Sequence, residues 1–179
     1  MDDDSSPRNS LAVAVDWPLS EAALEALCHR AREALETELD LSDDLRQTQI
    51  SFLFTDDAAI ADLNFTYRGK ERPTNVLSFP LLDGTEDQNA RPGERLLGDI
   101  VLALETVSAE AAASSRPIDE HLSHLLIHGH LHLLGYDHGQ ADDASAMERI
   151  EIRALGRLGI ADPYATGAEP VEVGAPSHA

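Results

Sequence analysis

Histidine is concentrated in one short stretch of this 179-residue chain, because six of its eight histidines lie between positions 121 and 138. His128 and His132 are four residues apart, so on an α-helix both side chains lie on one face and can bind one ion. Gly135 can end that helix in a left-handed conformation, which would bring His138 back to the same point. Three neutral imidazoles with a fourth position open are typical of catalytic zinc, whereas structural zinc sites have four ligands and are often rich in cysteine. Since the chain has a single cysteine, the pattern predicts a catalytic metal site at His128, His132 and His138.

The same spacing occurs in the metzincin peptidases, whose pattern is H-E-x-x-H-x-x-G-x-x-H. The chain matches this pattern at its three histidines and at Gly135, but position 129 is glycine. The glutamate that acts as general base in peptide hydrolysis is therefore missing, and a peptidase of that mechanism is disfavoured.

The remaining histidines of the stretch fall on two sides of the predicted helix. His121 and His124 share the stripe of the predicted ligands but lie at its other end, so we expect them to line the cleft or to support a ligand. His130 points to the other side, and its expected role is structural.

Charge distinguishes the middle of the chain from its two ends. The formal net charge is −20, from 33 acidic and 13 basic residues, which argues against a surface that binds nucleic acid or anionic membranes broadly. Residues 63–98 differ, because their five acidic and five basic residues cancel. Arg68, Lys70 and Arg72 fall within five positions there, and such cations can bind phosphate. A solvated loop is the plainer interpretation of the same residues.

Hydrophobic periodicity and capping residues predict an α+β domain with four strands and about five helices. The expected strands are 11–15, 49–55, 75–79 and 97–104, and the expected helices are 20–38, 56–64, 105–114, 119–134 and 143–158. Residues 66–74 are expected to be a loop, and 81–93 a turn-rich connection. One domain should span residues 11–164, between loose tails at 1–10 and 165–179.

Cysteine content and apolar runs bear on the cellular compartment. One cysteine cannot form an internal disulfide, and no apolar run exceeds five residues, against the roughly 18 needed for a membrane span. The chain also begins with acidic residues rather than with a secretory signal. These features predict a cytoplasmic protein with no membrane partner.

The sequence resembles the YbeY family of bacterial metal-dependent endoribonucleases through four blocks in the same order. The blocks are LNFTYRGKERPTNVLSFP at 63–80, LGDIV at 97–101, the histidine stretch 128–138 and GIADPY at 159–164. By this resemblance the three histidines would bind one zinc ion, or another transition metal such as Ni²⁺, and Arg68 would face the metal. The fold would be a small mixed four-stranded sheet packed against helices, with the metal-binding helix bordering a groove.

The resemblance also implies a substrate and partners. Members of the family are associated with cleavage of single-stranded RNA, with maturation of the 3′ end of 16S ribosomal RNA and with quality control of 70S ribosomes. The implied partners are the small ribosomal subunit and the GTPase Era.

The residue chemistry supports phosphodiester hydrolysis independently. Such a reaction needs a nucleophile, a polarised oxygen and a group that stabilises charge at phosphorus. Our hypothesis is that the metal activates water and Arg68 holds a phosphate, with Lys70, Arg72 and His124 as further substrate-binding residues. The attacking group can be water or the RNA 2′-hydroxyl. Two alternatives stay open: a metallopeptidase without the usual glutamate, and a non-catalytic ribosome assembly factor with a structural metal.

Overall fold

The protein is described by a computed structural model that covers residues 9–81, 95–137 and 139–165. The strands within these residues are β1 (Asn9–Val13), β2 (Gln49–Thr55), β3 (Val76–Pro80) and β4 (Leu96–Ala103). The helices are α1 (Glu21–Leu39), α2 (Asp43–Arg46), α3 (Asp57–Arg68), α4 (Leu104–Ala113), α5 (Ile118–Leu133) and α6 (Ala141–Arg157).

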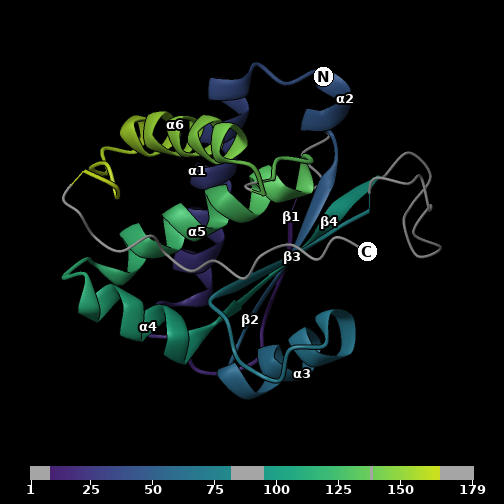
Figure 1. Ribbon diagram of the computed structural model, residues 1–179, viewed down its shortest axis with the longest axis vertical. Coiled ribbons are helices and arrows are strands. Elements are labelled where there is room, and N and C mark those ends of the chain that lie inside the picture. Colours follow the sequence, from purple (N-terminus) through teal and green to yellow (C-terminus); the bar gives the residue numbers. More distant parts are fainter. Residues whose placement is uncertain (1–8, 82–94, 138, 166–179) are drawn as a thin grey trace.

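The four strands form one mixed sheet in the order β1-β2-β4-β3 (Figure 1). β1, β2 and β4 run parallel to one another, and β3 runs antiparallel to β4 at one edge. The expected α+β fold with a small mixed sheet is therefore confirmed. None of the helices in the described part of the chain is long and apolar enough to cross a membrane.

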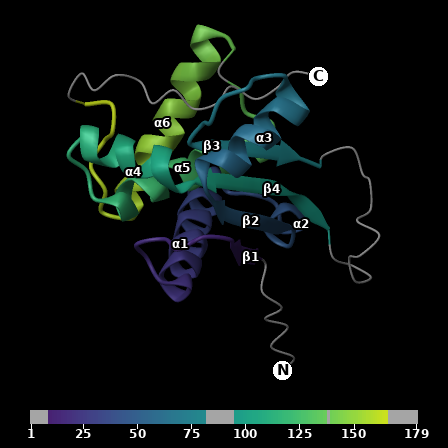
Figure 2. The ribbon, with the colours of Figure 1, turned by 90° about the horizontal axis from the view of Figure 1, so that it is seen from below.

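Helices cover both faces of the sheet (Figures 1 and 2). Alternate residues of β2 and β4, such as Phe52 and Ile100, face a large apolar core that also contains residues of α1, α5 and α6. The residues between them face α3, where Ile60 packs with Leu77 and Val101. This alternation is what the twofold periodicity of a strand requires when both faces are covered.

The histidine-bearing helix α5 lies at the centre of the molecule, and every residue from His121 to Leu133 is buried. It lies very close to the sheet at Gly129, where an added Cβ atom would be 3.0 Å from Ser78 Oγ and 3.2 Å from Ile100 Cγ2. Gly135 has a φ of +95°, and the Tyr136 amide donates to the Leu131 carbonyl oxygen at 3.0 Å. The predicted end of the helix at a left-handed glycine is thus confirmed.

Several element boundaries differ from the sequence-based expectation. α3 continues to Arg68 and ends at Gly69, which has a φ of +67°, so Arg68 lies in the last helical turn and not in the predicted loop 66–74. The short helix α2 was not expected, and β1 begins at Asn9, two residues before the expected start. Most of the expected tails and of the 81–93 connection lie outside the described residues.

Candidate metal and phosphate site

Two of the predicted metal ligands lie in the last two turns of α5 with their rings in contact. Nε2 of His128 is 2.8 Å from Nε2 of His132. Both residues are buried, with 4% and 6% of their surface exposed. The four-residue spacing therefore brings two ring nitrogens to one point.

Hydrogen bonds on the other side of each ring indicate which nitrogen carries the proton. Nδ1 of His132 is 2.9 Å from the backbone carbonyl oxygen of Tyr136, which can only accept, so this nitrogen is the donor. Nδ1 of His128 donates in the same way to the carboxylate of Glu151. In the neutral rings each Nε2 then carries a lone pair. Two lone pairs that face one another at 2.8 Å repel unless a cation is shared between them.

This donor set fits a zinc-type ion. A metal-binding histidine almost always donates its other N–H to a carboxylate, a backbone carbonyl or water, and both rings do so here. Nitrogens at tetrahedral positions around zinc are roughly 3.3 Å apart, so the rings need to separate by only about half an ångström. No group of three candidate ligands is found among the residues that the structure describes. His138, the third predicted ligand, lies outside them.

Glu151 of α6 connects His128 to a buried hydrogen-bond network. One carboxylate oxygen accepts from His128, and the other accepts from His124 Nε2 at 2.9 Å and from the hydroxyl of Tyr164. Burial alone would raise the pKa of this carboxyl, but the hydrogen bonds from His124 and His128 outweigh it and hold the pKa well below its usual range. Glu151 is therefore an anion with 1% of its surface exposed, and it fixes the orientation of a predicted metal ligand.

Glu151→Gln is expected to weaken zinc binding by about 10- to 100-fold, because hydrogen-bond partners behind a metal ligand contribute about that much to affinity. The amide keeps the shape of the side chain but loses the charge that favours the donor form of His128 Nδ1. Competition between the protein and a fluorescent zinc chelator measures the effect. Glu148→Gln, an exposed position three residues earlier on α6, is the matched control. Unchanged zinc affinity in a folded Glu151→Gln protein would show that Glu151 does not position the ligand.

The role of Glu151 was not anticipated from the sequence, although a pattern pointed to it. The buried face of α6 consists of Met147, Glu151, Ala154 and Leu155, at the spacing of an amphipathic helix. A carboxylate on such an apolar stripe needs a buried partner. The histidines of α5 are that partner.

Arg68 reaches β3 from the end of α3. Its Nη2 donates to the backbone carbonyl oxygen of Ser78 at 3.2 Å, and its Cζ lies 5.9 Å from the centre of the Phe79 ring. Burial lowers the pKa of the guanidinium, yet an arginine stays charged near neutral pH. The Ser78 hydroxyl donates in turn to the Gly129 carbonyl oxygen at 3.1 Å, so one residue links Arg68 to the helix of His128.

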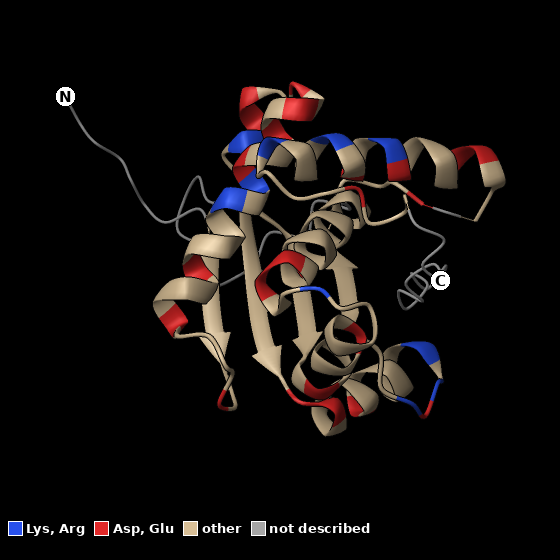
Figure 3. Ribbon diagram, turned by 90° about the vertical axis from the view of Figure 1, so that its left-hand side faces the viewer, with Lys and Arg blue, Asp and Glu red and all other residues tan. Residues whose placement is uncertain are grey.

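Lys70 and Arg72 are exposed in the loop that follows α3. Asn64 holds this loop, because its side-chain Nδ2 donates to the Arg72 carbonyl oxygen at 2.8 Å and its backbone carbonyl oxygen accepts from the Lys70 amide at 3.3 Å. Figure 3 shows acidic residues spread over many helices and basic residues in a few places only. The loop therefore presents positive charge in a fixed position on an acidic protein.

Comparison with known proteins identifies the family. The model of the family described as "Endoribonuclease YbeY" matches residues 14–159. Proteins named endoribonuclease YbeY are 47% identical over 155 residues in Nitrobacter hamburgensis and 43% identical over 159 residues in Bradyrhizobium diazoefficiens. These matches cover 87% and 89% of this chain and 80% and 86% of the relatives. The chain belongs to the YbeY endoribonuclease family.

The family is one of hydrolases, and a solved structure supports the fold. The solution structure of TM1509 from Thermotoga maritima has a TM-score of 0.50 and 21% sequence identity, and the match covers 90% of this chain and 99% of the other. At that identity the likeness concerns the fold alone. The expected membership of the YbeY family is thus confirmed by sequence.

In this YbeY family member the other histidines of α5 are buried and contact protein groups. His124 is fully buried and bonds Glu151, so it lies behind His128 and has no surface for a substrate. His121 Nε2 is 2.8 Å from Glu110, which also bonds Asn75. His130 is buried on the other side, where burial and then the charge of Arg32 lower its pKa to about 3.

Position 129 explains why a YbeY protein differs from the metzincin pattern. Residue 129 points at the sheet, against Ser78 and Ile100, where even a Cβ atom is crowded. A glutamate there would crowd Ser78 and Ile100 unless these side chains moved. The close contact between α5 and the sheet at Gly129 therefore disfavours the general base of that peptidase pattern in this chain.

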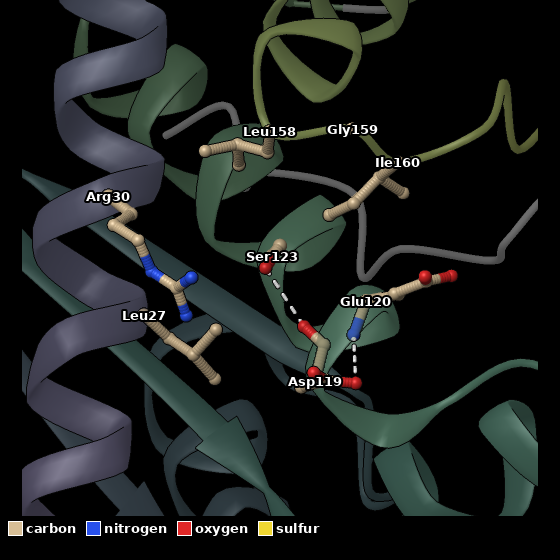
Figure 4. A pocket seen from close by; sticks show the side chains of 8 residues that line it. All are labelled: Leu27, Arg30, Asp119, Glu120, Ser123, Leu158, Gly159 and Ile160. Carbon is tan, nitrogen blue, oxygen red and sulfur yellow. Dashed lines mark hydrogen bonds between the residues drawn. The ribbon is translucent and has the colours of Figure 1, made fainter.

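A shallow pocket at the other end of α5 contains none of the predicted site residues (Figure 4). Its volume is about 130 Å³, and it is lined by Leu27, Arg30, Asp119, Glu120, Ser123, Leu158, Gly159 and Ile160. Polar groups of its wall bond one another, as when Ser123 donates to the Asp119 carbonyl oxygen at 2.9 Å. The pocket therefore shares no residue with the candidate site at His128 and His132.

Proposed function

We propose that the chain is a metal-dependent endoribonuclease that hydrolyses single-stranded RNA, with His128, His132 and His138 as ligands of one zinc ion or of another transition metal such as Ni²⁺. The proposal rests first on the facing Nε2 atoms of His128 and His132, whose other ring nitrogens donate to fixed acceptors. A bound zinc ion supplies Lewis-acid chemistry, because it lowers the pKa of a coordinated water towards about 7 and polarises a phosphoryl oxygen.

The protein's own residues perform the positioning. Glu151 keeps the proton of His128 on Nδ1, and the Tyr136 carbonyl does the same for His132, so both rings present lone pairs to one point. Arg68 binds the phosphate that is cleaved or its neighbour, and its fork stabilises negative charge that develops on the phosphoryl oxygens. Lys70 and Arg72 contact further phosphates of the same strand. His124 acts through Glu151 rather than on the substrate.

Membership of the YbeY family supports a biological setting for this activity. We propose that the RNA is the precursor of 16S ribosomal RNA, cleaved in maturation of its 3′ end, and that the enzyme also acts in quality control of 70S ribosomes. The partners in this proposal are the small ribosomal subunit and the GTPase Era. A large particle of that kind offers a local RNA strand to a protein whose overall charge of −20 repels RNA elsewhere.

Metal removal tests the proposed reaction. Nuclease-free protein is assayed on single-stranded RNA and on casein, each with and without a chelator, and zinc is then added back. We expect RNA cleavage that is lost with chelator and restored by zinc, and no casein hydrolysis. Cleavage that survives complete metal removal would contradict the metal-dependent mechanism. Zinc-dependent casein hydrolysis would instead favour the peptidase alternative.

A further inference from the structure

Two aromatic side chains of α3 are exposed although the rest of the described apolar side chains are largely covered. Tyr67 is 62% exposed and Phe65 is 53% exposed, and these are the exposed large hydrophobic residues in the part of the chain that the structure describes. A single exposed aromatic is ordinary and needs no explanation. The surroundings of Tyr67 distinguish it from Phe65.

Tyr67 belongs to a cluster of aromatic and cationic groups at the edge of the sheet. Its ring meets the ring of Phe79 at a centroid distance of 5.2 Å and an angle of 61°. Arg68 Cζ lies 5.9 Å from the centre of the same Phe79 ring. The half-buried Phe79 thus supports both the open Tyr67 ring and the guanidinium proposed to bind phosphate. Phe65 is two residues from Tyr67, so it projects about 200° away around the helix axis.

The cluster is held in place by the turn that ends α3. Gly69 adopts a left-handed conformation, and its amide donates to the Phe65 carbonyl oxygen at 2.9 Å. Asn64, 3% exposed, bonds both the Lys70 amide and the Arg72 carbonyl. An aromatic platform whose backbone is already fixed loses little conformational entropy when a ligand binds.

The cluster also lies beside β3, which is an edge strand of the sheet in the part of the chain that the structure describes. The Asn75 carbonyl and the Leu81 amide bond β4, at Ala103 and Leu97. Because hydrogen-bonding direction alternates along a strand, the carbonyl of Ser78 points away from β4, and there it accepts from Arg68. Arg68 therefore marks the edge of β3 that faces away from β4.

The chemistry of this cluster matches one kind of ligand. Aromatic rings next to arginine and lysine are the means by which proteins bind single-stranded nucleic acid, with bases stacked on the rings and phosphates on the cations. A paired base is already stacked within its helix and offers no free face. An acidic protein surface would find the cations of Arg68, Lys70 and Arg72, but it would have no planar group for Tyr67. RNA with unpaired bases offers both: phosphates for the cations and a planar base for the ring of Tyr67.

We infer that Tyr67, supported by Phe79, stacks on one unpaired base of single-stranded RNA close to the phosphate that Arg68 binds. The identity of the ligand as RNA rests on the proposed function. The RNA would cross this edge of β3, with its phosphates towards Arg68, Lys70 and Arg72. A base stacked at Tyr67 would give the enzyme a requirement for single-stranded substrate that the metal ligands alone do not impose.

Direct binding tests this inference without relying on cleavage. The probe is a fluorescein-labelled, 2′-O-methyl phosphorothioate oligonucleotide of about 12 unpaired nucleotides, within the usual length of such sites. Fluorescence anisotropy gives its Kd for the zinc-loaded protein. Tyr67→Ala is expected to weaken binding about fivefold or more, since stacking contributes about 1–3 kcal/mol per base. Tyr67→Phe keeps the ring and should bind like the unchanged protein.

Phe65→Ala is the matched control, because it removes an exposed aromatic that projects from a different side of the same helix. It should leave the Kd unchanged. Salt dependence separates stacking from charge: Tyr67→Ala should keep the slope of log Kd against log salt, whereas Lys70→Ala should reduce it by about one. Equal losses in Tyr67→Ala and Phe65→Ala, or normal binding by folded Tyr67→Ala, would overturn the inference.

An abasic scan identifies the stacked base. One abasic nucleotide is moved along the probe, and we expect a single position where it weakens binding as much as Tyr67→Ala does, with no further loss when both changes are combined. Wild-type protein that binds the probe with this pattern but cleaves no RNA would refute the proposed hydrolase and leave the inference standing. Zinc-dependent cleavage together with normal probe binding by Tyr67→Ala would refute the stacking inference and leave the proposed hydrolase standing.

Discussion

His132→Ala is expected to abolish stoichiometric zinc binding and to reduce cleavage of single-stranded RNA to the level of the chelator-treated protein. The change removes one of the two facing Nε2 atoms and also the bond from Nδ1 to the Tyr136 carbonyl. A lone His128 then has no partner in α5 for the ion. Metal analysis by mass spectrometry and a cleavage assay on the same preparation measure the two effects together.

Two further variants make this result specific. His132→Gln keeps a polar side chain of similar length and separates loss of the ligand from loss of packing. His29→Ala removes an exposed histidine of α1 and should change neither zinc content nor activity. Circular dichroism and thermal melting follow the fold. If His132→Gln loses its fold together with its zinc, the metal is structural and the assembly-factor alternative is favoured. A His132→Gln protein that is folded, zinc-free and inactive supports a catalytic role for the metal.

Arg68→Glu is expected to lower kcat/KM for RNA cleavage by about 100- to 1000-fold while zinc content stays normal. Loss of one group that stabilises charge in the transition state commonly has an effect of about that size, and the new carboxylate also repels the phosphate. Arg68→Lys keeps the charge but loses the planar fork, so we expect partial activity. Quenched time courses of RNA cleavage, on preparations with equal zinc content, measure kcat/KM for each variant.

The control for charge reversal is Arg149→Glu on the exposed side of α6. This substitution changes the net charge by the same amount, but on α6 and not beside β3. The Arg149→Glu protein should therefore cleave RNA normally. Because Arg68 also bonds the Ser78 carbonyl, the melting temperature of each variant is measured as well. Normal cleavage by a folded, zinc-loaded Arg68→Glu protein would remove Arg68 from the proposed mechanism.

The sequence predicted the fold class and the helix that carries the two facing histidines, because both depend on local spacing. The left-handed glycine at the end of α5 is fixed by backbone sterics, and it is readable from a single residue. The end of α3 was harder to place. The sequence TYRGK suggested a loop, yet Thr66 to Arg68 continue the helix and Gly69 ends it, which moves Arg68 onto a rigid element.

No local sequence pattern predicted the hydrogen bonds that Glu151 and Tyr164 make next to the predicted metal ligands. Glu151 lies 23 residues after His128 and bonds it only because α6 packs beside α5. Tyr164 reaches the same carboxylate from beyond the end of α6. Such pairs depend on tertiary packing, which spacing along the chain does not encode. The sequence also suggested that His124 contacts substrate, whereas its burial places it behind Glu151.

The dependence of His128 on Glu151 gives the chain an order of assembly during its own synthesis. The ribosome makes His128 and His132 first and reaches Glu151 23 residues later, about one to five seconds at ordinary elongation rates. Until α6 has emerged and folded back onto α5, nothing holds the proton of His128 on Nδ1. The nascent protein therefore carries His128 without the anion that orients its ring until α6 has packed against α5.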